Sequence, residues 1–460
     1  MNHSTLPVPS QDLLLRPQDY SLLTDLYQLT MTACYVGEGV DQCRANFELF
    51  ARRLPAQFGY LVAMGLEQAI EYLEQWRFST EQIAALQATG LFDHAPDRFW
   101  HVLETGQFTG DVWAVPEGTP LFANQPVLRV EAPLWQAQIV ETYLLNTINY
   151  QTLIATRSAR LRDVAGDQVT LLEFGTRRAF SPQASLWAAR AALAAGLDST
   201  SNVLAALQLG QRPSGTMAHA LVMALAALEG TETEAFQAFH RYFPGATLLI
   251  DTYDSIAAAR HLADQIRQGQ AKVKAIRLDS GDLLAQAQQV RQLLPDVTIV
   301  ASGDLDEYEI QRLRTAEAPI DAYGIGTQLV TGVPVNGVYK LVEIDGIPVM
   351  KASSQKVTYP GRKQIFRRLD PQTRTWHDRL GLADEPAAPD EQPLLQCVLK
   401  QGQRLAPPES LATIAARTRS GVTALPLELR QIEQPAPAPV ELSSALQRLT
   451  AQTQSHLPQV

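Results

Sequence analysis

Three polar turns recur at regular spacing in the second half of the chain, and each follows a short apolar run. They read Arg-Leu-Asp-Ser-Gly-Asp (277–282), Ser-Gly-Asp-Leu-Asp (302–306) and Tyr-Gly-Ile-Gly-Thr (323–327). A period of about 25 residues is typical of one β/α unit. The carboxyl ends of parallel strands meet on one face of a β/α barrel, where active sites lie. Carboxylates, a guanidinium and bare glycine amides on that face predict a pocket for a phosphorylated sugar with a metal ion on its charged groups.

The first turn carries a cation and an anion two residues apart. Arg277 and Asp279 therefore project to the same side of their strand and can bind different parts of one polar ligand. Ser280 and Gly281 complete the turn. The alternative is a salt-bridged strand end followed by an ordinary turn, but the two later motifs favour a functional role.

The second and third turns extend this pattern. Gly303 allows a ligand to approach the backbone closely. Asp304 could accept hydrogen bonds from sugar hydroxyls or hold Mg²⁺ through water. Alternatively, Asp304 or Asp306 caps the next helix, and we expect capping to explain one of the two. Gly326 and Thr327 near a helix start would offer free amides to a phosphate.

Two further segments carry chemistry. Glu-Phe-Gly-Thr-Arg-Arg (173–178) closes an earlier strand. There Phe174 could stack on a flat heterocycle, although alone it reads as a core residue, and Arg177 could bind a carboxylate or phosphate. His219 follows a Gly-Thr turn ahead of an apolar helix. A lone histidine is more often structural, but at this turn it could act as a base or accept a phosphoryl group.

The elements that must position these residues follow from hydrophobic patterning. Near-continuous apolar strands alternating with helical segments predict an α/β fold, an irregular or incomplete β/α barrel over 151–340 that carries the active site. Residues 21–150 predict an N-terminal α+β domain with a helix, an antiparallel sheet and a long helix. The first helix should bury a stripe made of Leu22, Leu26, Leu29 and Ala33. Tyr27 lies off that stripe and is free to face something else.

The remaining segments are assigned by composition. Residues 1–20 predict a loose leader, and 341–433 predict a small C-terminal β-containing extension that packs back on the N-terminal domain. The tail, 434–460, is rich in Pro, Ala, Gln and Ser, which predicts flexibility. The part after residue 380 suggests no function beyond packing.

Composition excludes several classes of function. A net charge of −10 over 460 residues argues against general nucleic-acid binding, which needs a basic surface. Three cysteines without metal-ligand spacing fit a reducing compartment. The N-terminus has no signal-peptide pattern, and no stretch reaches the roughly 18 apolar residues of a membrane span. We therefore expect a cytoplasmic protein with no nucleic-acid or membrane partner.

Taken together, the motifs resemble the nicotinate phosphoribosyltransferase family of type II phosphoribosyltransferases. The segments that carry the resemblance are 22–31 (Leu-Leu-Thr-Asp-Leu-Tyr-Gln-Leu-Thr-Met), 47–50, 173–179, 198–205, 215–219 (Gly-Thr-Met-Ala-His), 277–282, 324–327 and 351–356. The resemblance implies transfer of a phosphoribosyl group from phosphoribosyl pyrophosphate to nicotinate. It also implies Mg²⁺, coupling to ATP hydrolysis through a phosphohistidine, and a homodimer with shared active sites.

The resemblance also implies roles for individual residues. His219 matches the phosphorylated histidine. The catalytic set is His219, Asp279, Asp304 and Arg277, with Mg²⁺ held by Asp279 or Asp304 through water. The ribose and phosphate set is Ser280, Gly281, Gly303, Gly326 and Thr327. The base set is Phe174, Arg177, Asp198 and, from a neighbouring subunit, Tyr27.

Three alternatives stay open at this point. The first is a nicotinamide phosphoribosyltransferase, because related enzymes also place an Arg beside the ring. The second is a Schiff-base sugar-phosphate aldolase on the same barrel, with Lys274 or Lys340 as the amine. The third is a phosphoribosyl sensor without turnover, against which the presence of Asp279, Asp304 and His219 argues.

Overall fold

The computed structural model describes residues 13–353, 356–369, 376–438 and 440–456. The chain divides into two compact units. The first unit comprises Met1–Leu153, Pro334–Ser410 and Ser420–Val460, and the second comprises Ile154–Val333 and Leu411–Arg419. The predicted leader lies mostly outside the described residues.

A seven-stranded antiparallel sheet forms the centre of the first unit. Its order is β13 (Ile347–Pro348), β12 (Gly337–Ile344), β1 (Arg44–Ala51), β5 (Pro126–Pro133), β3 (Asp111–Ala114), β19 (Gln396–Lys400) and β20 (Gln403–Arg404). β1 pairs with both β12 and β5, so the C-terminal part of the chain completes a sheet begun near the N-terminus. Every β1 residue after Arg44 is buried, because both faces of this central strand are covered.

The N-terminal part of the first unit adds helices to this sheet, of which α5 packs on β1 and β5 and α1 packs on α5. They are η1 (Pro17–Asp19), α1 (Leu26–Gly37), α2 (Leu66–Gln75), α3 (Thr80–Ala88), α4 (Asp97–Glu104) and α5 (Leu134–Ile139). Of the predicted stripe, Leu29 is buried and Leu22 and Ala33 pack against the core, but Leu22 precedes the helix and Leu26 is 52% exposed. Gln28 is buried instead, because its side chain donates to Glu141 Oε2 at 2.8 Å. A tertiary hydrogen bond thus decides which face of α1 turns inward.

A smaller four-stranded sheet also belongs to the first unit. Its order is β18 (Gln392–Pro393), β16 (Lys363–Leu369), β17 (Trp376–Leu382) and β21 (Val440–Leu442). Shorter pairs join β2 (Leu61–Val62) with β4 (Pro120–Leu121), and β14 (Ala352–Ser353) with β15 (Lys356–Val357). The helices α16 (Leu427–Arg430) and α17 (Ser444–Ser455) complete the C-terminal part of this unit, whereas most of α15 (Leu411–Thr423) belongs to the second unit.

The C-terminal tail contains regular structure where flexibility was expected. β21 pairs with β17, and Ser443 caps α17 by accepting from the Leu446 N–H at 3.0 Å. Leu446 is fully buried in the core of the first unit. Composition alone did not show that these few apolar side chains have a core to enter.

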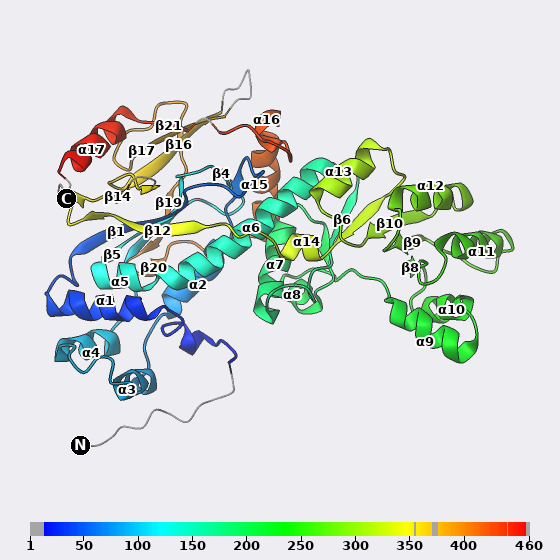
Figure 1. Ribbon diagram of the computed structural model, residues 1–460, viewed down its shortest axis with the longest axis horizontal. Helices are drawn as coiled ribbons and strands as arrows, with labels where there is room; N and C mark the ends of the chain where they lie inside the picture. The colour runs from blue at the N-terminus through cyan, green and yellow to red at the C-terminus, as the bar shows by residue number, and fades with distance from the viewer. Residues whose placement is uncertain (1–12, 354–355, 370–375, 439, 457–460) are drawn as a thin grey trace. The chain divides into compact units, whose positions relative to one another are not determined.

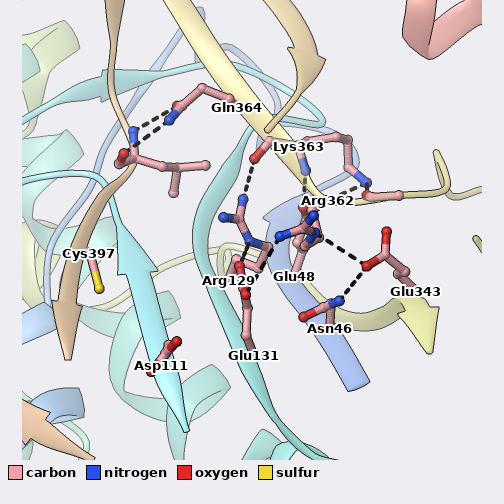
Figure 2. Close-up of polar contacts among 12 residues, drawn as sticks. Asn46, Glu48, Asp111, Arg129, Glu131, Glu343, Arg362, Lys363, Gln364 and Cys397 are labelled. Atoms are coloured by element: carbon pink, nitrogen blue, oxygen red, sulfur yellow. Dashed lines mark hydrogen bonds and ion pairs between the residues drawn. The ribbon is translucent and has the colours of Figure 1, made fainter. Parts of the chain in front are cut away.

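A buried ion cluster links the two sheets of the first unit (Figure 2). Lys363 Nζ on β16 lies 2.9 Å from Glu48 Oε2 on β1, and both side chains are inaccessible to solvent. The same ammonium donates to the carbonyls of Tyr359 and Gly361, at 2.6 and 2.8 Å. Burial lowers the pKa of Lys363, and the Glu48 carboxylate opposes this shift. Arg129 donates to the Lys363 carbonyl at 2.5 Å. Protein groups therefore supply the hydrogen-bond partners of the buried Lys363 ammonium and of its backbone carbonyl.

The second unit is built on a six-stranded parallel sheet (Figure 1). Its order is β7 (Ser199–Thr200), β6 (Thr170–Glu173), β11 (Ala322–Ile325), β10 (Thr298–Ser302), β9 (Ala275–Leu278) and β8 (Leu248–Leu249). Its helices are α7 (Pro182–Ala194), α8 (Val203–Gln208), α9 (His219–Glu229), α10 (Glu232–Tyr242), α11 (Ser255–Arg267), α12 (Leu283–Leu293), α13 (Glu307–Thr315) and α14 (Thr327–Val330). The long helix α6 (Glu141–Ala165) leads into this unit from the first.

The parallel sheet does not close. In the described part of the chain β7 and β8 form its two edges and do not pair with each other. The α/β class is therefore confirmed, whereas the expectation of a barrel, even an irregular one, is not. Both edge strands have only two residues, and the connection between them is occupied by α8, α9 and α10.

Candidate functional site

A cavity of about 670 Å³ opens at the carboxyl ends of the parallel strands, entirely within the second unit. Its lining includes residues from the ends of β6, β9, β10 and β11. The predicted site residues that line it are Phe174, Arg177, Arg277, Asp279, Gly303, Asp304, Gly326 and Thr327. The structure therefore brings the three polar turns together, as their spacing predicted.

Arg277 organises the floor of this cavity. Its Nε donates to Ser302 Oγ at 2.8 Å, and its Nη2 donates to Asp279 Oδ1 at 2.7 Å. Nη1 donates to Thr216 Oγ1 at 2.9 Å and to the Met217 carbonyl at 3.3 Å. Protein atoms thus take most of the guanidinium donors and leave a single N–H for a ligand.

Asp279 is held as a carboxylate. Burial raises its pKa, but hydrogen bonds from Arg277 and Ser302 outweigh that effect and hold the pKa of Asp279 below its ordinary value. The Asp279 N–H donates to Asp251 Oδ2 at 2.9 Å, and the Ser280 hydroxyl donates to the same oxygen at 2.7 Å. Asp251 therefore fixes the turn that carries Asp279.

His219 lies at the start of α9, beside the cavity that its neighbour Ala218 lines. Its Nδ1 is 3.1 Å from Thr252 Oγ1, within hydrogen-bond distance. Its Nε2 is 3.9 Å from Asp251 Oδ1 and 3.8 Å from Asp279 Oδ2. The imidazole is thus oriented through one nitrogen, and the other faces two carboxylates without bonding to either.

The two aspartates of the second turn have different roles, one in the cavity and one as a helix cap. A Cβ on Gly303 would lie 2.0 Å from the Asp279 carbonyl oxygen, so only glycine fits there. Asp304, in the left-handed region at φ 48°, lines the cavity. Asp306 caps α13 by accepting from the Glu309 N–H at 2.8 Å. The expectation that capping explains one of the two aspartates is confirmed.

Phe174 forms an aromatic wall of the cavity. A Cβ on Gly324 would lie 2.6 Å from the Phe174 ring, so this glycine makes room for the side chain. The Arg277 guanidinium carbon lies 5.6 Å from the ring centroid, within cation–π range. The Gly-Ile-Gly motif therefore serves two purposes, because Gly324 accommodates the ring and Gly326 lines the cavity.

Two arginines at the rim have no acidic partner. Arg177 and Arg178 are exposed, line the cavity, and form no ion pair with any described carboxylate. In a chain of net charge −10, two adjacent unpaired cations leave a strong local preference for an anion.

Several predicted residues do not reach this cavity. Ser280 and Gly281 belong to the same turn but do not line it. Asp198 precedes β7 and so lies at the amino end of that strand, where its Oδ2 accepts from Arg162 Nη2 at 2.5 Å and from the Leu171 N–H at 2.7 Å. It does not line the cavity, and its role near the base stays a prediction.

Tyr27 lies on α1 in the other unit. Its hydroxyl donates to Glu141 Oε2 at 3.2 Å, and its side chain is 47% exposed. Burial and the Glu141 carboxylate raise the pKa of Tyr27 to about 12, so the phenol stays protonated. The residue presents a ring anchored at its polar end.

The two lysines of the aldolase alternative are poorly placed for it. Lys274 precedes β9 and so lies at the amino end of the parallel sheet, away from the cavity. Lys340 lies in the first unit, with Nζ 3.7 Å from Glu141 Oε1. Neither amine lines the cavity, which removes the structural basis for a Schiff base there.

The sequence analysis missed three acidic residues around the site. Asp251 follows β8 and anchors the Asp279 turn, and it shares the strand-then-Asp pattern that identified the other turns. Glu173 is buried and accepts from the Thr200 hydroxyl and the Gly175 N–H, although burial raises its pKa. Burial and the charges of Asp251 and Asp254 raise the pKa of Glu232 to about 7. No local pattern marked Glu232, because its surroundings come from distant segments.

The carboxylates around the cavity fit a magnesium ion only if a substrate and water supply the other ligands. The described residues contain no cluster of three or more metal-ligating side chains. Asp251 Oδ1 is buried and makes no hydrogen bond there, and Asp304 opens to the cavity. Because Mg²⁺ keeps several waters and binds through one or two carboxylates with substrate phosphates, this donor set suits an ion that arrives with a phosphorylated substrate.

Comparison with known proteins gives a consistent result over nearly the whole chain. Models of the nicotinate phosphoribosyltransferase N-terminal domain, the nicotinate phosphoribosyltransferase family and the nicotinate phosphoribosyltransferase C-terminal domain match residues 22–149, 169–369 and 388–450. The last match assigns a domain to the region after 380 that the sequence analysis left without a function. In the described residues no helix is long and apolar enough to cross a membrane.

Individual relatives agree with these matches. A nicotinate phosphoribosyltransferase of Mycobacterium tuberculosis is 40% identical over 92% of this chain and 91% of the relative. The human nicotinate phosphoribosyltransferase is 34% identical over 95% of this chain and 97% of its own length. The crystal structure of human nicotinic acid phosphoribosyltransferase superposes with a TM-score of 0.82 at 31% identity, covering 93% of this chain and 99% of that one.

Proposed function

Because the chain belongs to the nicotinate phosphoribosyltransferase family, we propose that it converts nicotinate and phosphoribosyl pyrophosphate into nicotinate mononucleotide and pyrophosphate, in NAD salvage. Membership confirms the family and the enzyme class that the motifs predicted. The observation that carries the proposal to this chain's own residues is the cavity in which Asp279 and Asp304 face the unpaired Arg177 and Arg178.

The carboxylates suit the chemistry at the sugar. The nicotinate ring nitrogen forms a bond to the first ribose carbon while the bond from that carbon to the pyrophosphate oxygen breaks, and positive charge develops on the sugar. Asp279, ionised because Arg277 and Ser302 stabilise its charged form, would stabilise that charge electrostatically. Gly303 gives the sugar room against the backbone, and Gly326 and Thr327 would receive its 5′-phosphate.

The rim arginines suit an acidic base. Phe174 would stack on the pyridine ring, and Arg177 would pair with its carboxylate. A nicotinamide phosphoribosyltransferase is the second candidate, because an amide can also lie beside an arginine. Turnover of nicotinate and nicotinamide at equal concentration decides between them. We expect nicotinate to react faster, and faster use of nicotinamide would contradict the proposal.

Magnesium would act with the leaving group. Asp304, with Asp279 through water, would hold the ion against the substrate phosphates. When bound, Mg²⁺ neutralises charge on the departing pyrophosphate. The protein residues position the sugar and exclude other nucleophiles from its first carbon.

ATP coupling is proposed to run through His219. The imidazole Nδ1 is engaged by Thr252, so Nε2 is the nitrogen left to attack the γ-phosphorus of ATP and release ADP. Asp251 and Asp279, at 3.9 and 3.8 Å, would stabilise the positive imidazole ring that this step creates.

The His219→Asn variant tests this coupling. We expect it to bind nicotinate and phosphoribosyl pyrophosphate normally but to lose stimulation by ATP. With γ-labelled ATP, the wild-type chain should acquire an acid-labile, base-stable label at His219 and the variant none. Normal ATP stimulation of the variant would refute the phosphohistidine and leave the transfer reaction itself intact.

Exposed apolar side chains on two helices support a homodimer with shared active sites. Tyr27 and Leu26 on α1 are 47% and 52% exposed. On α8, Val203, Leu204 and Leu207 are 59%, 53% and 65% exposed, and Val203 lines the cavity. Exposed apolar side chains on α8, beside the cavity that Val203 lines, favour a second surface that covers them. The proposal is that the partner subunit's Tyr27 closes the nicotinate slot opposite Phe174.

A cytoplasmic location stays a prediction. Cys34, Cys43 and Cys397 are free thiols, as expected in a reducing compartment. The reaction needs cytoplasmic substrates such as ATP, which agrees with that location.

A further inference from the structure

A second cavity in the same unit lies at the amino ends of the parallel strands β8 and β9. It has a volume of about 460 Å³ and is formed by α10, α11, the turn before β8 and the segment before β9. Its residues precede β8 and β9, whereas the active cavity lies where the strands end. The two cavities share no lining residue.

Cations dominate the lining of this cavity. Arg241, Lys272 and Lys274 line it together with His240, and none of its lining residues is Asp or Glu. No described carboxylate forms an ion pair with Arg241, Lys272 or Lys274. By contrast, most arginines elsewhere in the described chain are paired, as Arg267 is with Asp264 on the neighbouring α11. Three unpaired cations around one hollow are unexpected in a chain of net charge −10.

The backbone holds two of these side chains in place. Gly245 has φ 75°, and a Cβ there would lie 2.9 Å from the Lys274 side chain, so glycine lets the lysine stem pass. The His240 Nε2 lies 2.8 Å from the Ala246 carbonyl oxygen, which ties α10 to the turn before β8. The turn therefore contacts the stem of the exposed Lys274 and the ring of the half-buried His240.

Part of the cavity lining is apolar. Phe236, Leu248 and Leu262 line it and are buried. A wall of this kind contributes nothing to binding a bare inorganic ion but stabilises an organic body. We propose that this cavity binds an organic phosphate, with its phosphate on Arg241, Lys272 and Lys274 and its apolar body against Phe236 and Leu248.

The position of this cavity connects it with the active one. Lys274 directly precedes β9, and Asp279 directly follows it, about 17 Å further along an extended strand. Helix α10, which supplies Arg241, packs against α9, which begins with His219. An occupant would contact the strand and the helix pair that carry two residues of the active site.

Calorimetric titration of the full-length protein with ATP, inorganic phosphate and adenosine tests the proposal. The test variant is Arg241→Gln with Lys274→Gln, and the matched control is Arg260→Gln, an exposed and unpaired cation on α11. We expect wild type and control to bind one equivalent of ATP that the double variant binds at least about tenfold more weakly. Phosphate should bind there more weakly than ATP, and adenosine should not bind.

Three results would overturn the proposal. They are an unchanged ATP isotherm in the double variant, adenosine binding equal to that of ATP, or phosphate binding as tight as that of ATP. Thermal melting shows whether the double variant is folded. If it is not, Lys272→Gln, whose side chain is exposed, should weaken the same equivalent about threefold, and no change would overturn the proposal. This test is separate from the proposed ATP coupling. ATP that reacts with His219 binds at the active cavity, and the Arg241 and Lys274 substitutions should leave that equivalent of bound ATP intact.

Discussion

Two ion clusters, one in each unit, use the same chemistry for different ends. In the first unit Lys363 and Glu48 lie 2.9 Å apart and are closed off from solvent. In the second unit Arg277 and Asp279 lie 2.7 Å apart on the wall of a cavity of about 670 Å³, where the Asp279 side chain is 27% exposed. The two clusters contain the same kinds of residue. They differ in solvent access, because the carboxylate of the second pair keeps an oxygen that a ligand can reach.

The difference shows that some charged residues stabilise the fold while others are kept accessible for catalysis. Around Lys363, backbone carbonyls and Glu48 take the ammonium protons, so breaking the cluster should change stability. Around Arg277, the hydrogen bonds orient Asp279 toward the cavity, so breaking that cluster should change turnover. The predictions below test this division from the largest effect to the smallest.

Lys363→Met should destabilise the first unit strongly. The substitution leaves the Glu48 carboxylate buried without its partner, which costs about 3–5 kcal/mol of unfolding free energy. Denaturant unfolding measures this loss. Adding Glu48→Leu to Lys363→Met should recover most of it, because an apolar pair of similar size removes the unpaired charge. A single variant as stable as wild type would show that the cluster does not hold the two sheets together.

Asp304→Asn should lower kcat about 100-fold with little change in stability, because it removes a charge that the transition state needs while Asn still tolerates the left-handed backbone. Steady-state kinetics measure the change. The matched control is Asp306→Asn, which keeps the α13 cap and should change kcat less than about twofold. Equal losses in both variants would contradict the assignment of Asp304 to the site.

Tyr27→Ala should weaken nicotinate binding by roughly 1–3 kcal/mol, because it removes an aromatic face that is 47% exposed. The Michaelis constant for nicotinate reports the change. Tyr27→Phe keeps the ring and should behave almost as wild type. An unchanged Michaelis constant in the alanine variant would count against the shared nicotinate slot.

Glu232→Gln should change the pH dependence of stability rather than turnover. Because folding raises the pKa of Glu232 to about 7, its stabilising contribution is complete below its unfolded pKa and is lost as pH rises through 7. The variant should therefore lose little of its stability between acidic pH and pH 8, compared with wild type. Parallel pH profiles of unfolding free energy for the two proteins would contradict the raised pKa.

Much of the site could be predicted from the sequence, since short motifs at strand ends keep their chemistry wherever the strands go. Phe174, Arg277, Asp279, Gly303, Asp304 and Gly326 were found in this way, and all line the cavity. The motif at Asp198 did not show that this residue lies at the amino end of its strand, outside the cavity. Asp251 was missed although it follows an apolar strand, because no turn glycine accompanies it.

The sequence by itself determined the parallel β/α region, the three polar turns and the family, since all of these depend on local patterns of residue type and spacing. Tertiary structure decided what depends on contacts between distant segments. It decided that Gln28 rather than Leu26 is buried on α1, that Asp251 anchors the Asp279 turn, and that the sheet stays open. It also decided that the Lys363 cluster is buried while the Arg277 cluster lines a cavity. Both contain the same kinds of charge, and only packing determines which of them a ligand can reach.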